Sequence, residues 1–173
     1  MDRAEMDRAE IVAEMARVEA DFAALVGEAG RSDLRRRSSG TRWTNRQLLY
    51  HMVFGYLIVR TLMPLVHVLG RSGRSHRFAA ALNAAHRPFH VVNYAGSWAG
   101  GQLVPPTAMV ALMRRTLRAL RRQLDRESEQ TLVLTMHFPT DWDPYFRPQM
   151  SVLDVYHYGT EHYDHHRRQL TLD

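Results

Sequence analysis

The sequence predicts an all-α fold, a four-helix bundle built by a single domain that spans residues 1–173. Three observations support this prediction. Apolar residues recur at three- and four-residue steps in four segments, which is the period of an amphipathic helix. No segment gives a convincing sheet pattern. The chain is long enough to bury one core, and it has no cysteine, so that core forms without disulfides.

The first predicted helix follows a repeated pentapeptide, MDRAE, and continues to about Glu28. A polar stretch comes next, after Gly27 and Gly30, which favour a helix end. The apolar stripe of this helix consists of Ile11, Met15, Val18, Phe22, Leu25 and Val26. These positions lie on one face of a helix, so we expect them in the core.

The second predicted helix begins after Thr44. Thr44 and Gln47 have the spacing of a capping box, in which each side chain bonds the other residue's backbone N–H. Apolar residues then recur from Leu48 to Leu62. Pro64 lacks a backbone N–H, so we expect it to kink or end this helix.

Two long connections flank the third predicted helix. Residues 70–106 are expected to be a partly ordered connection with a short helix before Pro88 and a glycine-rich loop after it. The third helix covers residues 106–126. Residues 131–149 then read as an extended segment and loop.

The fourth predicted helix begins after Ser151, a favourable N-cap residue, and runs to about Leu170. It carries the histidine-rich segment discussed below. The bundle therefore has long loops between its second and third helices and between its third and fourth helices.

Charge and composition limit the function. All 23 positively charged side chains are arginines, and the net charge is +5. Those of the third helix lie on a solvent face without interleaved aromatics, so we expect no nucleic-acid partner. The N-terminus has no apolar signal segment, and no uncharged apolar run approaches the roughly 20 residues of a membrane span. We therefore expect a cytoplasmic protein without a membrane partner.

The segment EHYDHHRRQL contains three histidines. His162 and His166 are four residues apart, so a helix places both imidazoles on one face. His165 is rotated from His166 by about 100° and does not join them easily. His51 lies on the apolar face of the second helix, where a facing histidine pair makes it the natural third metal ligand. Tyr163 follows His162, so the H-E-x-x-H motif of metalloproteases is absent.

Two glycines lie near the proposed metal face. Gly55 is one turn beyond His51, and Gly159 precedes His162 by three residues. Each costs about 1 kcal/mol relative to alanine within a helix. Two explanations remain open at this point: the missing side chains leave room for a substrate, or they permit close helix packing.

These motifs resemble the DinB-like (DinB/YfiT) superfamily. The resemblance rests on Trp43 with His51 eight positions later, and on H-x-x-x-H-x-x-Q at His162, His166 and Gln169. The resemblance extends over essentially the whole chain, because the helices and loops follow in the same order as in that superfamily. It implies a down-up-up-down bundle, often a homodimer, with a divalent metal on the three histidines. Zinc is the first expectation, with nickel or iron as alternatives.

The resemblance also implies a first functional hypothesis, a thiol S-transferase or a thiol-dependent isomerase acting on a small molecule. The cosubstrate would be mycothiol, bacillithiol or glutathione. A three-histidine ion keeps open positions and would deprotonate a thiol. Tyr158 is the candidate hydroxyl donor, although core packing explains it equally well. Arg87, Arg147, Arg167 and Arg168 are candidates for holding an anionic substrate.

Two alternatives remain. In the first, a thiol-independent metalloenzyme of specialised metabolism (a hydrolase, cyclase or isomerase) binds a bulkier substrate beside His90, Asn93 and Trp142. In the second, the chain is a non-enzymatic metal-binding bundle whose site is closed by a fourth protein ligand.

Overall fold

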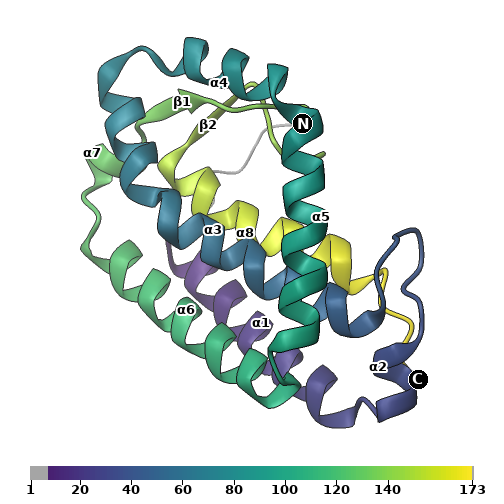
Figure 1. The fold of residues 1–173 in the computed structure, drawn as a ribbon. Coiled ribbons are helices and arrows are strands. Elements are labelled where there is room, and N and C mark those ends of the chain that lie inside the picture. Colours follow the sequence, from purple (N-terminus) through teal and green to yellow (C-terminus); the bar gives the residue numbers. More distant parts are fainter. Residues whose placement is uncertain (1–7, 173) are drawn as a thin grey trace.

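The structure is a computed structural model, and it describes residues 8–172. Within them it has eight helices and one antiparallel pair of short strands (Figure 1). The elements in chain order are α1 (Arg8–Glu28), α2 (Arg31–Arg35), α3 (Asn45–Ser72), α4 (Ser75–Ala84), α5 (His86–Leu103), α6 (Pro106–Arg126), α7 (Glu129–Leu132), β1 (Thr135–His137), β2 (Gln149–Ser151) and α8 (Val152–Arg167). The prediction of an all-α fold is confirmed.

Four helices, α1, α3, α6 and α8, surround the core. Helix α1 packs against α6 and α8, and α3 packs against the same two helices. Their facing sides carry fully buried side chains, among them Ile11, Met15, Phe22, Leu49, Met52, Met113, Leu117, Leu120, Tyr156 and Tyr163. Helix α5 lies outside this group and crosses over α3 (Figure 1).

Helix α3 begins as predicted but is longer than predicted. Thr44 and Gln47 form the capping box, with the Thr44 N–H donating to Gln47 Oε1 over 3.0 Å. The prediction for Pro64 allowed either a kink or a helix end. The helix end is wrong, because α3 continues to Ser72. Pro64 is exposed, so solvent can bond the backbone carbonyl that lacks its usual partner. The helix ends at Gly73, whose φ of 64° is left-handed.

The expected long connection between residues 70 and 106 is a second correction. The short helix expected before Pro88 is present as α4, but the loop expected after it is instead the helix α5. The glycines that indicated a loop instead allow α5 to pack closely on α3. A Cβ atom at Gly100 would overlap the Tyr50 ring, and one at Gly101 would lie 2.7 Å from Gln47 Cα. Only glycine permits this approach of the two helices.

The connection from α6 to α8 contains α7 and the strand pair, where Met136 pairs with Met150. The loop between the strands is anchored to α4 and α5. The indole of Trp142 donates to Leu82 O over 2.7 Å and stacks on Phe89 with ring centroids 3.7 Å apart. Helix α8 has the predicted cap, in which Ser151 accepts from the Asp154 N–H.

Helix α3 is unusually apolar. Within the described residues it is the one helix long and apolar enough to span a membrane by length and composition, with a mean hydropathy of 1.7 over 18 residues. About two-fifths of that window is buried, 39%, and the helix contacts α5, α6 and α8. The core helix of a soluble protein has the same properties, and much of the remaining apolar surface of α3 lines the cavity described below.

Candidate metal centre

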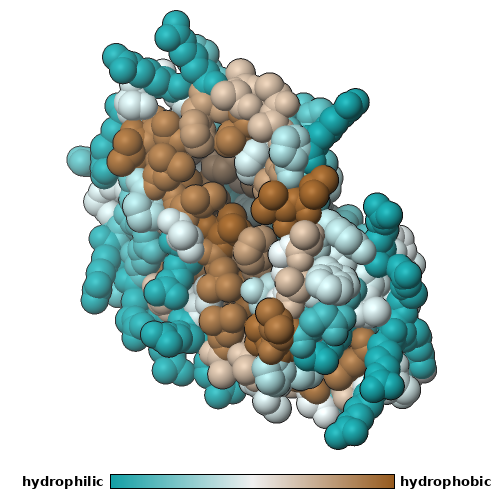
Figure 2. Space-filling view, viewed as in Figure 1, coloured by the Kyte–Doolittle hydropathy of each residue, from teal (hydrophilic) through white to brown (hydrophobic). Residues whose placement is uncertain are grey.

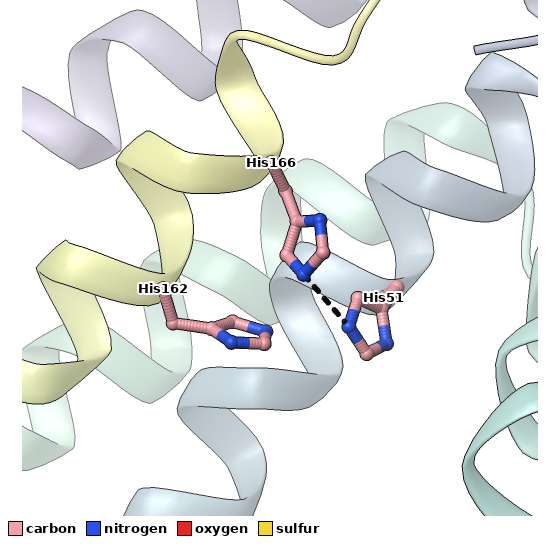
Figure 3. A group of neighbouring side chains, drawn as sticks. All are labelled: His51, His162 and His166. Carbon is pink, nitrogen blue, oxygen red and sulfur yellow. Dashed lines mark hydrogen bonds between the residues drawn. The ribbon is translucent and has the colours of Figure 1, made fainter. Parts of the chain in front are cut away.

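Three histidines meet between α3 and α8. His51 projects from α3, and His162 and His166 project from α8, so their rings converge (Figure 3). One nitrogen from each ring lies within 4.8 Å of the other two. The Nε2 atoms of His51 and His166 are 3.1 Å apart. The structure therefore brings together the three residues that the sequence predicts as ligands.

The other nitrogen of each ring faces away from the centre and has a partner. The three contacts are His51 Nδ1 to Ser97 Oγ at 2.9 Å, His162 Nδ1 to Asp143 Oδ2 at 3.0 Å, and His166 Nδ1 to Gln169 Oε1 at 2.7 Å. A carboxylate and an amide oxygen can only accept, so His162 and His166 carry their protons on Nδ1. Their Nε2 lone pairs consequently face the centre, as in histidines that bind a metal.

Two of the imidazoles, those of His51 and His166, are held in the neutral form that a metal requires. Burial, together with the neighbouring His162 and His166, lowers the pKa of His51 well below its ordinary value. Burial also lowers the pKa of His166, to about 3, with His162 adding to the effect. His162 Nε2 is buried and has no hydrogen-bond partner. Three ring nitrogens gather here, and the buried His162 Nε2 among them has no hydrogen-bond partner, so this set of residues suits a divalent metal.

The two glycines next to the histidines serve close packing. A Cβ atom at Gly55 would lie 2.6 Å from His162 Cδ2, so glycine gives that ring its space. A Cβ atom at Gly159 would lie 2.5 Å from Tyr56 Cε1, which holds α3 and α8 close together. Gly55 also borders the cavity below, whereas Gly159 does not.

Asp143 links the histidines to Tyr158. Its Oδ2 atom accepts from Tyr158 OH over 2.9 Å as well as from His162, and its Oδ1 atom accepts from the Tyr145 N–H. Burial alone would raise the pKa of Asp143, but these hydrogen bonds outweigh it, and the pKa is lowered. Burial and the nearby carboxylate raise the pKa of Tyr158 well above its usual value. Asp143 is therefore an ionised acceptor and Tyr158 a protonated donor.

A cavity of about 290 Å³ opens beside the three histidines. All but one of the predicted substrate-binding residues lie in its wall, namely Gly55, His90, Asn93, Trp142 and Tyr158. The exception is Gly159. Most of the remaining wall is apolar and comes from α3, α4 and the loop between the strands, so the cavity presents an apolar space directly to the histidine centre.

Other candidate residues point elsewhere. His165 borders the cavity but stays outside the convergent set, since its Nδ1 lies 3.3 Å from Tyr145 OH. None of the four arginines considered as anion clamps borders the cavity. Arg147 pairs with Asp154, Arg167 pairs with Asp21, Arg168 donates to Tyr145 OH, and Arg87 is exposed. Among the described residues, the cavity wall therefore has no arginine to serve as the anion clamp that the sequence allowed.

Two residues that support the centre were not predicted. Ser97 comes from α5, a segment that was expected to be a loop, so no helical face was assigned to it. Its spacing of four residues from Gly101 is the available signal, because it places two small residues on one helix face. Asp143 comes from a loop that carries no periodic signal. Gln169 was part of the recognised motif, and the structure gives it a role as partner of His166.

Comparison with known proteins agrees with this geometry. Residues 14–170 match the family model described as the DinB superfamily. No curated protein and no solved structure gives a match.

Proposed function

As the chain belongs to the DinB superfamily, we propose that it is a metal-dependent enzyme whose divalent cation is held by His51, His162 and His166. One observation carries the proposal. The Nε2 atoms converge while each Nδ1 atom is bonded to a separate partner, so the rings are oriented before any ion binds. The packed ring of α1, α3, α6 and α8 is the four-helix bundle that we propose as the scaffold, with down-up-up-down topology.

An open coordination position favours an enzyme over a structural metal site. Among the described residues, the convergent set has three members. Asp143 faces the far nitrogen of His162 and so supports a ligand instead of acting as the fourth one. Structural zinc sites use four protein ligands, whereas catalytic sites commonly use three. A bound cation would supply Lewis acidity and lower the pKa of a thiol or water beside it.

The residues of the cavity have separate roles in this proposal. Asp143 fixes the tautomer of His162 and accepts a hydrogen bond from Tyr158 OH, so Tyr158 is held with its hydroxyl beside the histidines. The apolar wall excludes water around the reacting group, which strengthens electrostatic effects there. Tyr158 is well placed to redirect its hydrogen bond to a substrate oxygen.

We propose a low-molecular-weight thiol, such as mycothiol, bacillithiol or glutathione, as the nucleophile, and thus an S-transferase or isomerase. The chain has no cysteine, so a sulfur nucleophile must come from a cosubstrate. Zinc is the first candidate ion, with nickel and iron after it. A homodimer in the cytoplasm is part of the same proposal. Water as nucleophile, in a hydrolase, is the second candidate, supported by the same open position.

Cobalt substitution tests the thiol proposal. We expect a millimolar thiol to produce a sulfur-to-cobalt charge-transfer band in the wild-type protein and in His165→Ala. The same thiol should be consumed by an electrophile only when all three histidines are present. A cobalt spectrum that no thiol changes would remove the transferase proposal. A spectrum that reports four protein ligands would replace the enzyme with a structural metal site.

A further inference from the structure

The cavity beside the histidines is much longer than a coordination site requires. Its wall follows α3 from Gly55 to Leu69, which corresponds to about 20 Å of helix. Its volume of about 290 Å³ is near the lower end of typical small-molecule pockets. The space thus fits an extended molecule that reaches the histidines with one end.

One wall is an apolar stripe of α3. Ile58, Leu62 and Leu65 border the cavity, and they remain 39%, 42% and 38% exposed. Figure 2 shows apolar side chains gathered on this face around a hollow. Exposed apolar surface of this kind marks binding sites in soluble proteins. A bound apolar molecule would remove this surface from water.

The opposite wall is aromatic. Phe89 and Trp142 stack with centroids 3.7 Å apart, and Phe138 and Phe146 lie 5.1 Å apart. Both pairs border the cavity. Because Trp142 is tied to α4 by its hydrogen bond to Leu82 O, this wall is fixed in place. Rigid aromatic and aliphatic walls recognise apolar shape.

The charges around the cavity restrict the chemical class of the ligand further. Among the described residues that border the cavity, Asp143 is the one carboxylate and there is no arginine. The Asp143 carboxylate already accepts from Tyr158, His162 and the Tyr145 backbone. A charged group along this wall would be desolvated without a partner, which is unfavourable. The wall therefore selects against a charged ligand.

We propose that the cavity binds an uncharged, elongated apolar molecule of the acyl-chain type, with its one polar group at the histidines. The proposal rests on the proposed function in one respect, because that polar group would be the electrophile of the reaction. The polar groups of a low-molecular-weight thiol would find no hydrogen-bond partners along this apolar wall. A thiol cosubstrate would consequently approach from another side of the centre.

Displacement of an uncharged fluorescent probe tests the binding chemistry. Metal-free protein is titrated with N-phenylnaphthylamine, which is then displaced by decanol, decanoate or decylammonium. We expect decanol to displace the probe at a concentration at least tenfold lower than either charged analogue. Equal displacement by all three compounds, or no probe binding, would overturn the proposal. Because the protein is metal-free, this result is independent of whether the proposed metal enzyme is correct.

Two matched variants of α3 locate the binding site. Leu65→Asp places a charge in the cavity wall, and we expect it to weaken probe binding at least tenfold. Val68→Asp is the control, since Val68 is 62% exposed on the same helix but does not border the cavity. Thermal unfolding checks that both variants fold. Equal weakening by both variants would contradict the proposal. A dimer that Leu65→Asp dissociates, without probe binding to the wild type, would assign the surface to a second copy of the chain.

Discussion

At the scale of single residues, His51 and His162 each depend on a neighbour from another segment, whereas His166 is held by Gln169, three residues further along. The spacing of His162 and His166, with His51 on an apolar helix face, allowed all three to be predicted because helical geometry relates residues along one element. Asp143 and Ser97 were not predictable in this way. Each is brought to its histidine by the packing of a separate segment, which no local spacing encodes.

Asp143→Asn tests the supporting role of this carboxylate. The variant keeps the size of the side chain but removes the charge that holds the His162 Nδ1 proton. Changes of this kind weaken metal affinity by about 10- to 100-fold, and we expect a loss in that range. Asp141→Asn is the matched control, because Asp141 is exposed two residues away. Competition with a chelator gives both affinities, and equal values would rule out the supporting role.

At the scale of elements, the sequence predicted the four helices that surround the core but missed α5. Periodic apolar residues identify helices that face a core, and α1, α3, α6 and α8 all do so. Helix α5 packs through Ser97, Gly100 and Gly101, small residues that also favour loops. Whether such residues form a helix depends on the partner surface on α3, so local pattern alone could not decide it.

Gly101→Ala tests the close packing of α5 on α3. The added Cβ atom would lie 2.7 Å from Gln47 Cα, and neither backbone can move without disturbing a helix. We expect the free energy of unfolding to fall by about 1–3 kcal/mol. Gly96→Ala is the control within the same helix, because nothing lies within 4 Å of its added Cβ atom. It should raise stability by about 0.5–1 kcal/mol. Chemical denaturation measures both, and a stabilised Gly101→Ala would contradict the packing.

At the scale of the whole molecule, the histidine centre makes the stability of the metal-free protein depend on pH. The pKa values of His51 and His166 are lower in the folded state than in the unfolded state. Below about pH 6.5 the unfolded chain therefore binds more protons, so unfolding becomes easier as the pH falls from 7 towards 4. His157 has a raised pKa and acts in the opposite direction, since its stabilisation is lost as the pH rises.

Thermal melts of metal-free protein between pH 7 and pH 4 measure this dependence. We expect the melting temperature to fall with pH in the wild type and to fall less in His166→Gln, which lacks one of the depressed groups. His157→Gln should show a decrease at least as large as the wild type, because His157 opposes it. A His166→Gln curve with the same slope as the wild type would show that this histidine is not held neutral by the fold.

The metal centre is the claim on which the functional proposals rest, and the metal content of purified protein tests it most directly. We expect elemental analysis to find close to one divalent ion per chain in the wild type and in His165→Ala. His51→Ala, His162→Ala and His166→Ala should each lose most of it, because each removes one converging Nε2 atom. Chelation should also lower the melting temperature, since the ion binds only the folded state. A wild-type protein without metal, or equal loss from all four variants, would contradict the three-histidine centre.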